Sequence, residues 1–173
     1  MNDNDFRTWT QDDERYNMTE AFDFENYPDA QYRYLKDNGC LVVALAIMVR
    51  LFGIEKETDF NKFNPLIFLE RAKVAGCFSK SADFMLSEIP RLYPIEQFEC
   101  IPYSREALID SINKGYASVL MVAGKNAPHH YVVPYKILDN DVSIIDNKFR
   151  KNLVSQYKEV YYIVNFRRIN RIK

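Results

Sequence analysis

The chain has 173 residues, of which 47% are hydrophobic and 27% charged, a balance typical of a folded domain with its own core. Its formal net charge is −1, and no basic stripe with interleaved aromatic residues occurs, which argues against nucleic-acid binding. The absence of a run of 18 apolar residues predicts that the chain has no membrane span.

The first 30 residues form an acidic segment. They carry nine acidic and two basic residues, whereas the remainder carries 15 acidic and 21 basic residues, so a segment of charge −7 precedes a body of charge +6. Aromatic residues such as Trp9, Phe22 and Phe24 are unusual in a disordered tail. We therefore expect a strap that packs on the domain, with a free tether for a partner as the alternative. The acidic, polar start predicts no signal peptide and hence cytoplasmic synthesis.

Helices are predicted mainly in the first two thirds of the chain, between typical start and stop residues. The first is apolar nearly all round, which predicts a buried helix. Asn64 and Ser104 are typical N-caps, and Pro65 suits a first helical turn. The predicted helices run from Leu41 to Phe52 with Gly53 as the stop, from Pro65 to Gly76, from Ser81 to Glu88 with a break at Pro90, and from Ser104 to Gly115.

Strands are predicted mainly in the last third of the chain. Asp139-Asn140 is typical of a hairpin turn between two of them. The predicted strands cover residues 95–101, 117–123, 130–138, 141–145 and 160–166. Helices followed by hairpin-connected strands predict an α+β fold in two layers, with N-terminal helices packed on a mostly antiparallel sheet.

The cysteines are Cys40, Cys77 and Cys100. Their odd number and wide spacing predict neither a disulfide framework nor a zinc site, and no metal or cofactor is expected. Cys77 and Cys100 have apolar neighbours, which predicts that both lie in the core. Cys40 opens the apolar helix, where unpaired backbone N–H groups and the helix dipole favour a thiolate.

A histidine pair and a carboxylate follow far downstream of Cys40. His129 and His130 begin one predicted strand, and Asp146 ends the next. Successive side chains of a strand point to opposite faces, so only one histidine can face the thiol, and we expect this to be His130. The order Cys40, His130, Asp146 suits a nucleophile, a base and the group that orients the base. In the alternative, Asp146 is a turn residue and Asn147 orients the histidine.

These residues resemble the C39-like cysteine peptidases, a group with the papain-like fold. The likeness rests on Gly39-Cys40 at the start of a helix that contains Met48, and on the residues around His130 and Asp146. The family commonly has Pro after this Asp, where the present chain has Asn147. The resemblance implies a papain-like domain over residues 31–166, after the acidic segment 1–30 and before a basic tail, 167–173.

Papain-like enzymes usually place a Gln shortly before the nucleophile, as an oxyanion donor beside the backbone N–H of the cysteine. Here the sixth residue before Cys40 is Tyr34. Residues 11–16 are similar to a Gln-x-Asp-x-Arg-aromatic stretch that precedes the Gly-Cys helix in some C39-like domains. The resemblance therefore favours Gln11 as the donor, with Gln31 as the second candidate.

The resemblance implies a cysteine peptidase or amidase that hydrolyses a peptide or amide bond. It points to a peptide or peptidoglycan substrate in bacterial or phage cell-wall-degrading machinery, and hence to association with a virion. One alternative is an inactive papain-like protein in a larger assembly such as a phage particle, which the displaced Gln and Asn147 favour. Another is an acyltransferase with the same Cys-His-Asp order.

Overall fold

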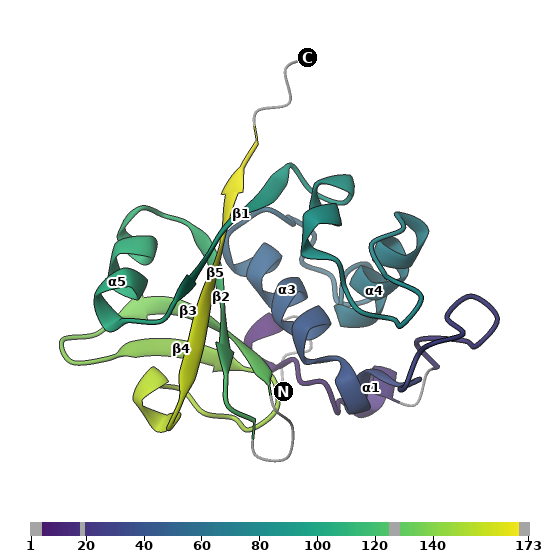
Figure 1. Cartoon of the computed structure of the whole chain (residues 1–173), viewed down its shortest axis with the longest axis horizontal. Helices are drawn as coiled ribbons and strands as arrows, with labels where there is room; N and C mark the ends of the chain where they lie inside the picture. Colours follow the sequence, from purple (N-terminus) through teal and green to yellow (C-terminus); the bar gives the residue numbers. More distant parts are fainter. Residues whose placement is uncertain (1–4, 18–19, 125–128, 170–173) are drawn as a thin grey trace.

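An antiparallel sheet lies at the centre of the molecule (Figure 1). The computed structural model describes residues 5–17, 20–124 and 129–169. Within these residues the strands form a five-stranded sheet in the order β1-β5-β2-β3-β4, and each neighbouring pair is antiparallel. The strands are β1 (Ile95–Pro102), β2 (Ala117–Val122), β3 (His130–Ile137), β4 (Val142–Asp146) and β5 (Val160–Arg168).

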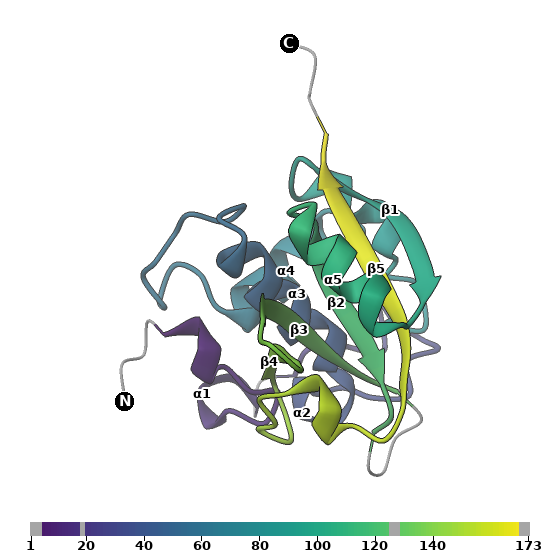
Figure 2. The same ribbon diagram turned by 90° about the vertical axis from the view of Figure 1, so that its left-hand side faces the viewer.

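Helices cover both faces of this sheet. Figure 1 shows α3 and α4 on one side and α5 on the other, and Figure 2 shows α5 in front of the strands. The α+β class is therefore confirmed, but α5 adds a layer to the two that were expected. The α-helices are α1 (Glu14–Asn17), α2 (Leu35–Asn38), α3 (Cys40–Leu51), α4 (Pro65–Val74) and α5 (Arg105–Asn113). Short 3₁₀ helices are η1 (Phe6–Thr8), η2 (Leu86–Arg91) and η3 (Val154–Gln156).

The sheet separates two hydrophobic clusters because neighbouring side chains of a strand alternate between its faces. Val133 of β3 belongs to the cluster that contains the buried residues of α3. Its neighbour Val132 belongs to the other cluster, which includes Leu108 of α5. The all-round apolar sequence of α3 explains its burial, since it lies between the sheet and α4.

Capping residues set the helix boundaries close to the predicted positions. The Asn64 side chain accepts hydrogen bonds from the backbone N–H groups of Leu66 and Ile67, and Ser104 accepts one from Ala107. Gly53 follows α3 with a φ of +62°, a conformation that favours glycine. These local signals act within one turn of chain and can therefore be read from the sequence.

The helix predicted over residues 81–88 is wrong. The Ser79 side chain accepts hydrogen bonds from the N–H groups of Ser81 and Asp83, and this local turn competes with a helix. Ala82 has a φ of 62°, outside the helical region. Regular structure resumes only at η2, a 3₁₀ helix.

The described part of the acidic segment contacts the domain. Trp9 is 2% exposed and packs against Phe60 and Phe63, and Phe22 is 8% exposed and packs against Phe78. Phe24 is 51% exposed. Most of the aromatic side chains that motivated the strap prediction are thus placed against the body.

The C-terminal boundary differs from the prediction. Arg167 and Arg168 continue β5, where Arg167 pairs with Glu96 of β1 at 2.8 Å. The backbone N–H of Ile169 donates to the Pro94 carbonyl at 2.9 Å, and residues 170–173 of the predicted tail lie outside the described residues. None of the helices in the described ranges is long and apolar enough to cross a membrane.

Candidate active site

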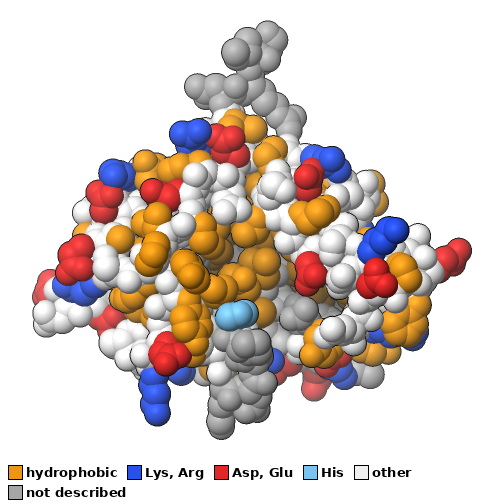
Figure 3. Space-filling model, in the orientation of Figure 1, with side chains coloured by type: hydrophobic (Ala, Val, Ile, Leu, Met, Phe, Trp, Pro, Cys, Tyr) orange, Lys and Arg blue, Asp and Glu red, His pale blue; other side chains and the backbone are white. Residues whose placement is uncertain are grey.

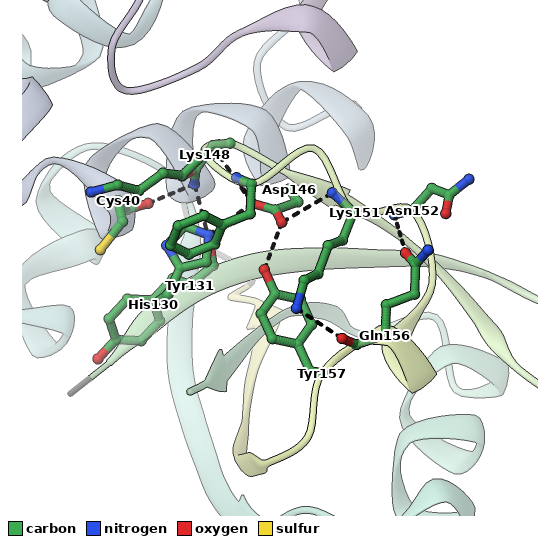
Figure 4. A network of polar contacts seen from close by, with 11 residues as sticks. Cys40, His130, Tyr131, Asp146, Lys148, Lys151, Asn152, Gln156 and Tyr157 are labelled. Carbon is green, nitrogen blue, oxygen red and sulfur yellow. Dashed lines mark hydrogen bonds and ion pairs between the residues drawn. The ribbon is translucent and has the colours of Figure 1, made fainter. Parts of the chain in front are cut away.

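The Asp146 carboxylate is the centre of a hydrogen-bond network at the end of β4 (Figure 4). His130 Nε2 lies 2.8 Å from Oδ1, and the Tyr157 hydroxyl donates to Oδ2 at 2.6 Å. Backbone N–H groups also donate to this carboxylate, from Lys148, Phe149 and Lys151. Burial raises the pKa of Asp146, but the hydrogen bonds from His130, Tyr157 and the backbone outweigh it and lower the pKa from 3.8 to about 2. The group is therefore a carboxylate at neutral pH.

This carboxylate fixes the state of the His130 imidazole. A carboxylate only accepts hydrogen bonds, so Nε2 must carry the hydrogen between the two groups. In the neutral ring the lone pair is then on Nδ1, which has no hydrogen-bond partner among the described residues. The ring is 2% exposed and packs edge-on against Phe149 at 5.0 Å between centroids. A histidine held in one tautomer, with a free lone pair, is suited to act as a base.

His129 lies apart from this network. Its side chain is exposed, and its ring packs against Tyr161. The alternation of side chains along a strand thus separates the two histidines as the sequence predicted, and His130 is the one that meets Asp146.

Asn147 links α3, which begins with Cys40, to β3, which begins with His130. Its side chain is buried, and Nδ2 donates to the carbonyl oxygens of Cys40 at 2.9 Å and of Tyr131 at 3.1 Å. These bonds join the first residue of α3, the residue after His130 and the end of β4 (Figure 4). Asn147 therefore does not orient the imidazole, and the alternative in which it replaces Asp146 finds no contact to support it.

Gly39 lets the chain enter α3 at this point. A Cβ atom at Gly39 would overlap the carbonyl oxygen of Leu35, which accepts a hydrogen bond from the Gly39 N–H at 2.6 Å. This close approach of two backbone segments requires a residue without a side chain. Gly39 thus fixes the backbone position from which the Cys40 side chain projects.

The expectation that the helix start makes Cys40 a thiolate is wrong in direction. Burial raises the pKa of the thiol above its usual value, and the N–H groups of Tyr131 and Leu41 and the charge of Lys148 oppose this without reversing it. No hydrogen bond joins the thiol to His130 in the part of the chain that the structure describes. The thiol form is favoured, so a base is needed to activate it.

A cleft of about 590 Å³ opens beside Cys40. Its lining includes Gln31, which is exposed, but not Gln11. Gln11 is 1% exposed, and its Nε2 donates to the Lys36 carbonyl at 2.6 Å. Its backbone N–H donates to the Asn147 carbonyl, which brings it close to the site. Neither glutamine is hydrogen-bonded to Cys40.

The other cysteines make no hydrogen bond to this network in the described residues. Cys77 is buried, as predicted, but Cys100 is exposed. The Cys100 prediction is wrong because β1 is an edge strand, and its apolar neighbours in sequence do not place this position in the core. In the described ranges, no cluster of His, Cys, Asp and Glu is arranged to hold a metal ion.

Tyr157 is the site residue that sequence reasoning missed. It directly follows η3 and lies 11 residues after Asp146 in the sequence. No periodic pattern or motif links the two residues. Its pKa is raised by burial and by the hydrogen bond to Asp146, which keeps the hydroxyl a donor.

Comparisons with protein-family models, curated proteins and solved structures give no match to this chain, so its function is inferred from the residues of the site.

Proposed function

We propose that the protein is a cysteine peptidase or amidase with Cys40 as nucleophile, His130 as base and Asp146 as the group that orients the base. One observation carries the proposal: His130 Nε2 is paired with a buried carboxylate while Asn147 holds the next residue of β3 against the first residue of α3. An imidazole in a fixed tautomer, on a strand that is linked to a helix beginning with a cysteine, supports hydrolysis by a thiol nucleophile.

The first half of the reaction forms a thioester. His130 Nδ1 takes the thiol proton, and the Cys40 sulfur attacks the carbonyl carbon of the scissile bond. The backbone N–H of Cys40 donates to the oxyanion that develops. The imidazolium then gives its proton to the leaving nitrogen, the C–N bond breaks, and the amine departs. Asp146 stabilises the imidazolium throughout these steps.

The second half hydrolyses the thioester. His130 Nδ1 takes a proton from water, and the water oxygen attacks the acyl carbon. The C–S bond breaks, the sulfur regains a proton from the imidazolium, and the carboxylic acid leaves. Because burial raises the pKa of the Cys40 thiol, proton transfer between the sulfur and His130 is part of both halves, away from the thiol in the first and back to the sulfur in the second.

The fold we propose is papain-like, of the C39-like kind. An antiparallel sheet with a buried helix whose first residue is the cysteine supports this assignment. The substrate we propose is a peptide, such as a peptidoglycan stem or cross-bridge, acted on by a cell-wall-degrading component of a bacterium or a virion. Both rest on the resemblance of the residues around Cys40, His130 and Asp146.

The alternative is a papain-like protein that retains the scaffold without the activity. The raised pKa of the thiol and the Gln11 amide bound to the Lys36 carbonyl favour it. Catalytic hydrogen bonds are often loose until substrate binds, so these observations do not decide against hydrolysis.

Mass spectrometry of peptidoglycan fragments and of peptides, after incubation with the purified protein, tests the proposal. Wild type should release new amine and carboxylic acid ends, and Cys40→Ala should release none above background. Cys100→Ala, which removes an exposed thiol outside the site, is the matched control and should retain full activity. Equal activity of the wild type and Cys40→Ala would exclude the mechanism. Adduct formation with added glycinamide in place of hydrolysis would indicate an acyltransferase.

A further inference from the structure

The cleft beside Cys40 has a chemical character that suggests what it binds. Figure 3 shows a hollow in this face of the molecule, with hydrophobic side chains on its walls and a histidine at its edge. The lining comes from the chain before α3, from the first turn of α3, from the turn after Cys77 and from the start of β3. A volume of about 590 Å³ is in the range of clefts that hold a small ligand or several peptide residues.

Aromatic side chains form much of the wall. Tyr32 is 48% exposed, and Tyr34 and Tyr131 are partly exposed. The remaining aromatic lining residues are Phe22, Phe78 and Phe84. Ring faces attract cations as well as apolar groups, so the wall suits an ammonium group carried on an alkyl chain.

The charged side chains that line the cleft are all acidic. Asp29, Asp37 and Asp83 line it and are exposed, whereas no Lys or Arg contributes to the described lining. None of these three carboxylates has an ion pair or a side-chain hydrogen bond within the described ranges. By contrast, Glu55 beyond the cleft is paired with Arg71 at 2.9 Å. Unpaired carboxylates in a concave site raise the local concentration of cations.

Basic residues lie near the cleft without contributing to its described lining, and Lys80 is one of them, since its carbonyl accepts a hydrogen bond from the Asp29 N–H. The Lys36 ammonium lies 5.3 Å from the centre of the Tyr34 ring and is not part of the lining. Lys148 acts on the Cys40 thiol and also lies outside the lining. His129 is the titratable basic group of the lining itself. The acidic lining therefore favours a positive group over a negative one in the cleft.

We propose that the cleft binds a peptide segment that carries a primary ammonium group on an alkyl side chain, such as lysine or another diamino acid, beside the bond presented to Cys40. Placing the scissile bond at Cys40 rests on the proposed function, whereas the binding preference does not. The aromatic wall would contact the alkyl chain, and the aspartates would face the ammonium group.

Isothermal titration of Cys40→Ala tests the binding preference. The ligands are the peptide Ala-Ala-Lys-Ala-Ala with blocked ends, its Nε-acetyl form and its glutamate counterpart, so that charge is the main difference. The lysine peptide should bind at least about tenfold more tightly than the acetylated form at low salt. The difference between the two dissociation constants should become smaller in 0.5 M NaCl. Equal affinities for all three peptides, or binding of none, would overturn the inference.

Charge-neutral variants locate the preference. Asp37→Asn and Asp83→Asn, each in the Cys40→Ala background, should reduce the preference about threefold, since each removes one of three exposed carboxylates. Glu106→Gln on α5, on the other side of the sheet, is the matched control and should leave the preference unchanged. Circular dichroism verifies that each variant is folded.

Hydrolysis of the same peptides by wild type separates the two proposals. A binding preference without hydrolysis of any peptide would overturn the peptidase function and support an acidic cleft that binds ammonium groups. Hydrolysis with equal kcat/KM for the lysine and acetyl-lysine peptides would support the proposed function and overturn the proposed preference for an ammonium group.

Discussion

At the residue scale, the hydroxyl group of Tyr157 is expected to contribute to the rate through Asp146. Tyr157→Phe removes one hydrogen bond to a buried carboxylate while keeping the ring against His130. We expect kcat to fall about tenfold with KM little changed, because the bond to a charged group is worth roughly 1.5–3 kcal/mol and only part of it acts on the imidazolium.

Tyr161→Phe is the matched control for this change. Its hydroxyl also donates to a carboxylate, that of Glu159 at 2.7 Å, but both groups are exposed. Steady-state kinetics of the two variants should therefore differ. Similar kcat values for both would show that Tyr157 has only a structural role.

The Asp146 carboxylate also predicts how stability depends on pH. Its pKa is about 2 in the folded protein against 3.8 for an unperturbed group, so the folded state releases this proton more readily. The contribution of Asp146 to the free energy of unfolding is fully present above pH 3.8 and is lost as the pH falls through 2. The shift corresponds to roughly 2 kcal/mol.

Urea unfolding from pH 6 to pH 2 measures this contribution. Wild type should lose more stability over that range than Asp146→Asn, which cannot titrate at this position. His130→Gln is a second comparison, because it removes one donor and should move the folded-state pKa of Asp146 upward. Parallel curves for wild type and Asp146→Asn would contradict the assignment.

At the element scale, Asn147 joins α3, β3 and β4, and its loss should destabilise the whole site. Asn147→Ala leaves the partly buried carbonyl groups of Cys40 and Tyr131 without these donors. Each such group costs about 1–3 kcal/mol, so we expect a loss of about 2–4 kcal/mol in the free energy of unfolding. The exposed Asn152→Ala is the control and should cost less than about 0.5 kcal/mol. A loss for Asn147→Ala no larger than that of its control in chemical denaturation would contradict the bridging role.

The elements also show which features the sequence predicts and which it does not. Asn64 and Ser104 act on N–H groups two or three residues away, so their helices were predicted near the observed positions. The pairing of His130 with Asp146 was predicted as well, since the hairpin register brings Val132 opposite Asp146. Local pattern and turn chemistry contain this information.

One local turn and two features that depend on the tertiary structure were not predicted. The Ser79 turn displaced the helix expected over residues 81–88, and Tyr157 reaches Asp146 without a sequence pattern. The direction in which the Cys40 pKa shifts depends on how deeply the thiol is buried, and its position at a helix start does not reveal this. The Tyr157 contact and the pKa of Cys40 depend on the tertiary structure, whereas the Ser79 turn is a local contact that competes with the expected helix.

At the scale of the whole molecule, the acidic segment connects the core to the site. Trp9 is buried against Phe60 and Phe63, and the backbone N–H of Gln11 donates to the carbonyl of Asn147 at 2.9 Å. The segment therefore packs on the residue that links α3 to the sheet. A change in the segment should therefore affect both the stability of the fold and the activity of the site at Cys40.

Removal of residues 1–30 should cause a large loss of stability if the segment is a strap. Trp9→Ala alone should cost about 3–5 kcal/mol, because a large buried side chain is lost and a cavity remains. Phe24→Ala is the matched control, since that ring is 51% exposed, and it should shift Tm by no more than a few degrees. Gln11→Ala keeps the backbone bond to Asn147 and removes the side-chain bond to the Lys36 carbonyl, so it should lower kcat while leaving Tm within a few degrees of wild type. A tether predicts a Tm within a few degrees of wild type for the truncated protein and for Trp9→Ala, and that result in thermal unfolding would exclude the strap.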